Sequence, residues 1–403
     1  MRNSLRRTSL LFYAAVFAAF VFVSAAETSA QLIISEFRVR GPNGANDEFI
    51  ELYNNSGADH TVAGGGTGYA VAASNGVARC VVPNGTVIPN RGHYLCVNSV
   101  GYSLASYPAG NGTTATGDAT YTTDIPDNAG IAIFNTSVAA NFIAANRLDA
   151  VGSTSEANTL YKEGTGYPAL TPFSIDYSFY RDNCGKSGSI TTFGGCPIST
   201  PKDTNNNAAD FIFVDTNGTS AGAGQRLGAP APENLSSPIQ RNASFAVDPL
   251  DPCVATTSPP NRVRDFTSDP ANNSTFGTLD IRRSVQNMTG ASVTRLRWRV
   301  IDLTTFPAPS GIADLRPRTS TAVVVTVDRS PCSSGTSNVT VQGTTLEQPP
   351  SQPNGGGFNS SLSSGTVTLA TPLANGATLD VRFLIGIQQT GTFKFFVNVE
   401  ALP

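Results

Sequence analysis

The stretch LDVRFLIGIQQTGTFKFFVNVE, residues 379–400, decides the fold class of this chain. Apolar side chains occupy alternate positions on both sides of a short turn at 389–391. They are Leu379, Val381, Phe383, Ile385 and Ile387 before the turn, and Phe393, Phe395, Val397 and Val399 after it. A period of two is typical of strands with one buried face. The stretch therefore predicts two strands joined as a hairpin on a β-sandwich.

The same alternation recurs along the chain, between turns rich in Gly, Pro, Asn, Thr and Ser. It predicts strands at 32–39, 48–53, 94–97, 130–134, 210–214, 278–285, 293–301 and 322–327. Only residues 138–147 offer a candidate helix longer than a turn or two. We therefore predict an all-β protein made of two immunoglobulin-like β-sandwich domains.

The first 30 residues have the pattern of a secretory signal peptide. Arg2, Arg6 and Arg7 precede an apolar run at 10–23, and small residues follow it. The run of about 14 residues is shorter than the roughly 20 that a membrane-spanning helix needs. We expect a mature chain without a transmembrane segment that is secreted or lies at the cell surface, with the periplasm as the alternative.

A Pro-rich segment divides the rest of the chain. Residues 229–238, APAPENLSSP, fit neither a strand nor a helix and are predicted to be a linker. The predicted domains are therefore 31–228 and 239–403, because about 370 residues exceed what one core usually spans.

Six cysteines in an exported chain favour structural disulfides, because the compartment is oxidising. Proximity in the sequence favours pairing neighbours, although six cysteines allow 15 connectivities. The favoured pairs are Cys80 with Cys96, Cys184 with Cys196, and Cys253 with Cys332. No C-x-x-C or Cys/His cluster of the kind that binds zinc is present in the sequence.

Short motifs in the first half resemble bacterial exported lamin tail domains (LTD). The motifs are I-S-E at 34–36, D-E-F-I-E-L-Y-N at 47–54, V-I-P at 87–89, Y-L-C at 94–96, D-T-N-N-N-A-A-D-F at 203–211 and R-L-G-A-P at 226–230. The resemblance covers residues 31–235 and implies an immunoglobulin-like sandwich that acts as a non-enzymatic interaction module. The Gly-rich segment 64–68 and the cysteine pairs depart from the family pattern. Residues 238–403 resemble no family that we recognise.

Two groups of oxygen-bearing side chains are candidate calcium sites. The first group is Glu36, Asp47, Glu48 and Glu51, and the second is Asp203, Asn205, Asn207 and Asp210. Glu48 and Glu51 should point to opposite faces of one strand, which works against convergence. The second group lacks the Gly and Glu of a calcium-binding loop, because Ala208 and Val214 stand at those positions. Asx turns and capping explain these residues as well, so we expect no cofactor and keep calcium as the alternative.

Catalytic candidates are few. The only histidines are His60, which we interpret as a turn residue, and His93, which we interpret as a structural residue at a strand start. The G-x-S-x-G string at 218–222 lies in a Gly-rich loop, without the strand and helix that a nucleophile elbow needs. We therefore assign no catalytic and no metal-binding residues.

Arginines alternate along the predicted strand at 293–301. Arg295, Arg297 and Arg299 should share one face, with Trp298 buried on the other. We interpret the arginine face as solvated, and the alternative is an anion-binding face. A formal net charge of −3 excludes a general polyanion binder, and the lack of aromatic residues between the arginines disfavours nucleic acid.

These observations predict a secreted or cell-surface binding protein without enzymatic activity, whose partner is an unknown extracellular protein or glycan. The alternative is an accessory module that binds carbohydrate or nucleic acid for a secreted hydrolase.

Overall fold

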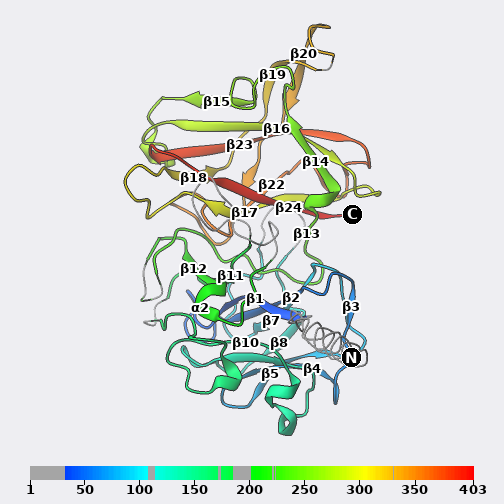
Figure 1. Cartoon of the computed structure of the whole chain (residues 1–403), viewed down its shortest axis with the longest axis vertical. Coiled ribbons are helices and arrows are strands. Elements are labelled where there is room, and N and C mark those ends of the chain that lie inside the picture. Colours follow the sequence, from blue (N-terminus) through cyan, green and yellow to red (C-terminus); the bar gives the residue numbers. More distant parts are fainter. Residues whose placement is uncertain are drawn as a thin grey trace, which may run out of the picture. The chain divides into compact units, whose positions relative to one another are not determined.

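The computed structural model describes residues 32–107, 114–170, 174–184, 201–219, 222, 224–329 and 331–403. The predicted signal peptide lies outside these ranges. In the described residues the protein is all-β, as the sequence predicts, and the sheets pack face to face (Figure 1).

The first half contains a six-stranded and a four-stranded sheet within the described residues. In spatial order the six-stranded sheet consists of β12 (Phe211–Asp215), β11 (Tyr177–Arg181), β1 (Leu32–Arg38), β2 (Phe49–Asn54), β7 (His93–Asn98) and β8 (Ala119–Tyr121). The four-stranded sheet consists of β10 (Arg147–Val151), β9 (Ile131–Phe134), β4 (Gly68–Ala73) and β5 (Ala78–Pro83). A short pair, β3 (His60–Thr61) and β6 (Val87–Ile88), lies beside them.

One hydrophobic core lies between these two sheets. It joins Ile34, Leu52 and Phe179 of the larger sheet to Val71 and Ile133 of the smaller one. The Cys80–Cys96 disulfide connects β5 to β7 and so ties the two sheets together covalently. This pair is one of those predicted from the sequence.

The second half forms another sandwich. One sheet consists of β13 (Ile239–Gln240), β24 (Phe395–Leu402), β17 (Arg295–Leu303), β22 (Ser361–Ser363) and β21 (Thr345–Leu346). The other consists of β14 (Phe245–Pro249), β16 (Thr278–Asn287), β23 (Thr378–Gln389) and β18 (Asp314–Arg318), with β15 (Arg262–Asp265) also paired to β16. Trp298 is buried in the core between the sheets, as predicted.

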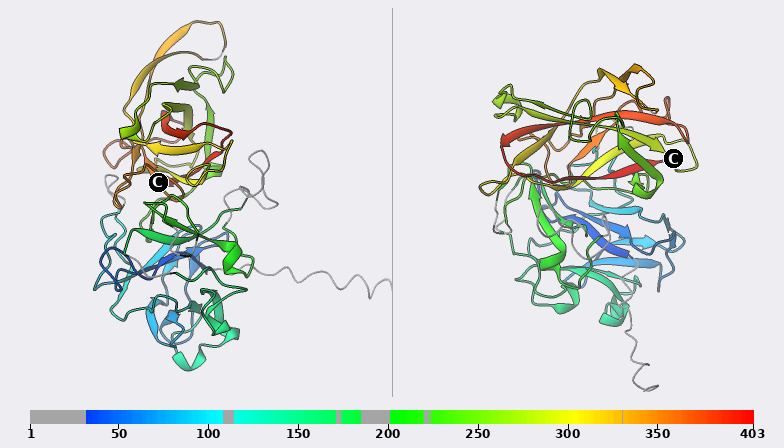
Figure 2. Two further views of the ribbon diagram at one scale, coloured as in Figure 1. Left: turned by 90° about the vertical axis from the view of Figure 1, so that its left-hand side faces the viewer. Right: turned by 45° about the horizontal axis from the view of Figure 1, so that its top comes forward.

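A two-stranded hairpin, β19 (Val323–Asp328) and β20 (Thr336–Val341), extends from the second sandwich (Figure 2). The Cys253–Cys332 disulfide joins its tip region to the segment after β14 and confirms a second predicted pair. The third predicted pair includes Cys196, which lies outside the described residues.

The hairpin predicted from residues 379–400 is wrong. β23 pairs with β16 and β18, whereas β24 pairs with β17 and β13, so the two strands belong to opposite sheets. Both strands alternate as predicted, because both turn one apolar face to the space between the sheets. The alternation of apolar and polar side chains indicates which face of a strand is buried, but it does not indicate which strand lies next to it.

The described helical elements are short. The candidate helix at 138–147 is instead two 3-10 turns, η1 (Ala139–Asn141) and η2 (Ala144–Asn146), and other single turns are η3 (Thr159–Tyr161), α2 (Asn207–Asp210), η4 (Asn242–Ser244) and η5 (Pro270–Asn272). No described helix has the length and apolar character needed to span a lipid bilayer.

The segment 229–238, predicted as a linker, connects the strands of the two halves. Most of its residues are buried, including Ala229, Ala231, Glu233 and Asn234. Residues 31–403 cluster as one compact unit. The division at this segment into two domains stays a prediction.

Candidate functional site

A β-bulge in β1 places two glutamates side by side. Ile34 lies opposite Leu52, but the register then shifts by one residue, so that Glu36 lies opposite Glu51. Ile34 packs in the core between the sheets. Without the shift, the Glu36 side chain would point to the same inward face of the sheet as Ile34. The bulge therefore turns Glu36 to the outer face of the six-stranded sheet.

The buried segment 229–238 covers this outer face. The backbone N–H of Ala231 donates to Glu36 Oε1 at 2.9 Å, and the backbone N–H of Glu233 donates to Glu51 Oε2 at 2.6 Å. His93, at the start of β7, lies on the same face. The two sheet glutamates therefore hold the segment by its backbone.

The second sandwich supplies two arginines and a glutamate. Arg297 and Arg299 lie on β17, and Glu400 lies opposite Arg297 on β24. Glu400 accepts from Arg297 Nε at 2.5 Å and from Arg299 Nε at 2.9 Å. Glu233 pairs with Arg297 as well, and its Oε2 lies 3.1 Å from Arg299 Nη2. Glu36, Glu51, His93, Glu233, Arg297, Arg299 and Glu400 are together called the ionic clamp.

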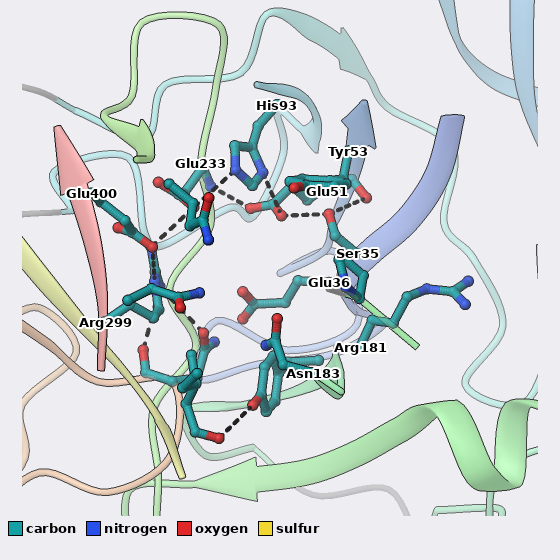
Figure 3. A pocket seen from close by; sticks show the side chains of 16 residues that line it. Ser35, Glu36, Glu51, Tyr53, His93, Arg181, Asn183, Glu233, Arg299 and Glu400 are labelled. Carbon is teal, nitrogen blue, oxygen red and sulfur yellow. Dashed lines mark hydrogen bonds and ion pairs between the residues drawn. The ribbon is translucent and has the colours of Figure 1, made fainter. Parts of the chain in front are cut away.

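His93 connects the two sides of the ionic clamp (Figure 3). Its Nδ1 lies 2.9 Å from Glu51 Oε1 and its Nε2 lies 3.1 Å from Glu233 Oε2. Two carboxylate partners require both ring nitrogens to donate, which only the imidazolium form can do. The geometry therefore indicates a protonated His93.

Burial and neighbouring charges shift the pKa values of the carboxylates in the ionic clamp in different directions. Burial alone lowers the pKa of His93, but the charges of Glu233 and Glu51 outweigh it and raise this pKa to about 9. Burial, together with the charge of Glu51, raises the pKa of Glu36 to about 7. Burial opposes ionisation of Glu400, yet Arg299 and Arg297 hold its pKa below the usual value. Burial, together with the charge of Glu400, raises the pKa of Glu233 despite the nearby His93, Arg299 and Arg297.

A cavity of about 80 Å³ is lined by residues of the ionic clamp together with Tyr53, Tyr180 and Asn359 among others. This volume suits a few water molecules and falls well below the roughly 300 Å³ of a typical ligand pocket. Ligand atoms of Glu51, His93 and Glu233 lie within 4.8 Å of one another, as in a metal site. However, both nitrogens of His93 already contact carboxylates, and Arg299 contacts Glu233. A metal ion would have to displace the proton and compete with the guanidinium, so we favour an ion-paired cluster.

The four carboxylates of the first calcium candidate separate as their strand positions predict. Glu36 and Glu51 enter the ionic clamp. Asp47 pairs with the buried Arg38 and accepts from Ser103 N at 2.9 Å. Glu48 accepts from Ile125 N at 2.7 Å and from Asn98 at 2.8 Å, and burial raises its pKa to about 8. The structure therefore does not bring the four together.

Two residues of the second calcium candidate, Asp210 and Asn207, accept hydrogen bonds from other parts of the chain. Asp210 accepts from the N–H of Thr204 at 3.0 Å and from its hydroxyl at 2.7 Å. Asn207 Oδ1 accepts from Gly152 N and Glu163 N, each at 2.9 Å. The Asp210 contacts are local, as in the capping role that the sequence offered as the alternative, whereas Asn207 joins segments far apart in the chain. Calcium binding stays a prediction.

A second acidic cluster brings together ligand atoms of Asp149, Glu163 and Asp203 within 4.8 Å. The Arg181 guanidinium lies 2.6 Å from Asp149 and 3.5 Å from Asp203. Burial and the charge of Asp149 raise the pKa of Glu163 to about 8. A guanidinium therefore already supplies the positive charge of this cluster.

The solvated arginine face predicted on β17 is wrong. Arg295, Arg297 and Arg299 do share one strand face, but each is at most 6% exposed. Arg297 and Arg299 form ion pairs with the carboxylates of Glu233 and Glu400, so these two arginines do not form an open anion-binding face. Arg295 donates to Thr294 O at 2.7 Å.

Of the remaining catalytic candidates, His60 is not part of the ionic clamp. His60 lies in the short strand β3 rather than in a turn, half-buried beside Tyr69, and burial lowers its pKa. Ser220 of the G-x-S-x-G string lies outside the described residues.

Sequence reasoning did not identify Glu233 and Glu400 as site residues. Glu233 lies in the predicted linker, where a glutamate suggests solvent exposure. Glu400 lies at one of the polar positions of β24, and the sequence predicts the wrong neighbouring strand for β24. The sequence did contain one relevant pattern, because Arg297 and Arg299 on one alternating strand are opposite in charge to Glu400 on another. This pattern predicts a cross-strand ion pair only if the two strands are known to be neighbours.

Comparison of the chain with protein-family models, with curated proteins and with solved structures finds no match in any of the three.

Proposed function

We propose that this chain is an exported binding protein without enzymatic activity, with a lamin-tail-like module as its first half. The motifs at 34–54 and 203–230 support the family. The Cys80–Cys96 and Cys253–Cys332 disulfides are compatible with an extracellular location and support export.

The contacts within the ionic clamp support a structural role for its acidic and basic residues. Catalysis needs a group that is free to exchange a proton or to attack a substrate. His93, which would be the natural general base, holds Glu51 and Glu233 with its two nitrogens. We therefore assign the ionic clamp to stabilising the scaffold.

An exposed aromatic surface supports binding. Phe266 follows β15 and is 79% exposed, and Phe276, which precedes β16, is 49% exposed. Arg264 connects them, because its guanidinium lies 4.4 Å from the Phe266 ring centre and also donates to the backbone oxygen of Phe276. The exposed Phe266 ring held by Arg264 is the observation that carries the proposed function.

A glycan is the partner that this surface fits best. One face of the Phe266 ring meets Arg264, and the ring can offer its other face to the C–H groups of a sugar, which the negative aromatic face attracts. Arginine and aromatic side chains also dominate the energetics of binding surfaces in general. The alternative, an accessory module that binds carbohydrate or nucleic acid for a secreted hydrolase, gains no support from the arginines of β17, because Arg297 and Arg299 are paired internally.

A glycan array tests the proposal with the purified mature protein and two variants. Phe266→Ala removes the exposed ring, and Leu369→Ala removes an exposed apolar side chain elsewhere, 72% exposed in the wild type. We expect a glycan signal that falls at least tenfold in Phe266→Ala and is retained in Leu369→Ala. Equal signals from both variants, or no bound glycan, would contradict this assignment of the surface.

A further inference from the structure

A cavity of about 310 Å³ lies between the two sheets of the second sandwich. One sheet contributes Val285 and Phe383, and the other contributes Trp298, Phe395, Val397 and Val399. Trp298 contacts Phe383 edge-on, with ring centres 5.2 Å apart, so the rings form a defined wall. The volume and the apolar lining fall within the range of small-molecule sites.

One residue of this cavity does not suit a plain hydrophobic core. Arg283 lies on β16 between Ile281 and Val285, and all three side chains line the cavity. Strand alternation places an apolar side chain at such a position in an ordinary sandwich. Arg283 is half-buried and its guanidinium lies near the backbone oxygens of Asn261 and Arg282, so its positive charge stands at the edge of the apolar space between the sheets.

The charge of Arg283 has no carboxylate partner among the ion pairs of the described residues. Its Nη1 donates to the backbone oxygen of Arg282 at 2.7 Å. Burial and the neighbouring charge of Arg262 both lower its pKa, which means that the surroundings disfavour the cation. An anionic group at this position would compensate the charge.

We propose that the cavity binds a small amphipathic carboxylate, such as a medium-chain fatty acid, with the carboxylate at Arg283 and the apolar chain against Trp298 and Phe383. Asn242 also lines the cavity, where its side chain donates to Asn398 and accepts from Val399 N, so Arg283 is the group assigned to the carboxylate. Val247 lines the cavity as well and is 51% exposed, which places it at the opening. This site is separate from the aromatic surface at Phe266 and does not depend on it.

Trp298 provides the readout, because it is the single tryptophan of the chain and lines the cavity. Decanoate and 1-decanol, each below its aggregation concentration, are titrated into the mature protein while tryptophan emission is recorded. We expect saturable binding of decanoate. Arg283→Gln should weaken decanoate binding at least tenfold and change decanol binding less than twofold, because a charge-assisted hydrogen bond is lost only with the carboxylate.

A second variant pair tests the location. Val247→Phe narrows the opening, and Val324→Phe adds the same bulk at a residue of the β19–β20 hairpin that is 70% exposed. Both variants should retain the wild-type circular dichroism spectrum and melting temperature. We expect Val247→Phe alone to reduce decanoate binding at least fivefold. Absence of a saturable response in the wild type, equal weakening of decanoate and decanol by Arg283→Gln, or unchanged binding in Val247→Phe would overturn the proposal.

Discussion

Replacing His93 by Gln should abolish a large alkaline loss of stability. The pKa of His93 is about 9 in the folded protein against 6.5 for an unperturbed histidine. Between these values the folded protein holds a proton that the unfolded chain releases, so the free energy of unfolding falls as pH rises. The stabilisation is complete below pH 6.5 and is lost as the pH passes 9. This pKa difference corresponds to about 3 kcal/mol.

Urea unfolding from pH 6 to pH 10, followed by Trp298 fluorescence, measures the contribution of His93 protonation to the free energy of unfolding. Other buried groups also titrate in this range, so the informative quantity is the difference between wild type and His93→Gln at each pH. That difference should shrink by about 3 kcal/mol from pH 6 to pH 10. Gln keeps a hydrogen-bond donor of similar size but leaves Glu51 and Glu233 without the imidazolium charge.

His60→Gln is the matched control, because burial lowers the pKa of the half-buried His60. A histidine with a lowered folded-state pKa loses stability on acidification and contributes no loss above neutral pH. The His60→Gln curve should therefore parallel the wild type from pH 7 to pH 10. If the His93→Gln curve also parallels the wild type over this range, His93 is not protonated in the ionic clamp and the charge assignment is wrong.

Three further variants test other contacts by the same unfolding assay. Glu36→Gln should raise the free energy of unfolding above pH 7 and leave it unchanged below pH 4.5. The reason is that the folded-state pKa of about 7 makes ionisation of Glu36 destabilising. An equal change in the free energy of unfolding at both pH values would contradict this. Arg297→Met should cost about 3–5 kcal/mol, because it leaves two buried carboxylates short of a partner; a cost below about 1 kcal/mol would show that the carboxylates find compensation elsewhere. Removing the Cys80–Cys96 disulfide with a double Ser variant should cost about 3 kcal/mol, as expected for a loop closed over 16 residues, and a reducing agent should then no longer lower the melting temperature through this pair.

Local patterns in the sequence were sufficient to locate several strands. The alternation at 278–285, 293–301 and 379–399 identified β16, β17, β23 and β24. It also placed Trp298 in the core and the three arginines on the opposite face. Alternation is reliable for such assignments because successive side chains on any strand point to opposite faces.

Strand partners were beyond the reach of the same patterns. Residues 379–400 look like a hairpin because two alternating segments flank a short turn, yet their strands lie in opposite sheets. An exchange of partners leaves the alternation unchanged, and this is why the sequence could not distinguish the two arrangements.

The sequence by itself determined an all-β chain and its buried strand faces, since both follow from local periodicity, and its order of cysteines favoured the two disulfides that the structure confirms. Only the tertiary structure decided the ionic clamp. A one-residue bulge turned Glu36 beside Glu51, the segment at 229–238 was buried rather than exposed, and β24 placed Glu400 opposite Arg297. Each depends on contacts between residues far apart in the chain, which no local pattern of charge or hydrophobicity records.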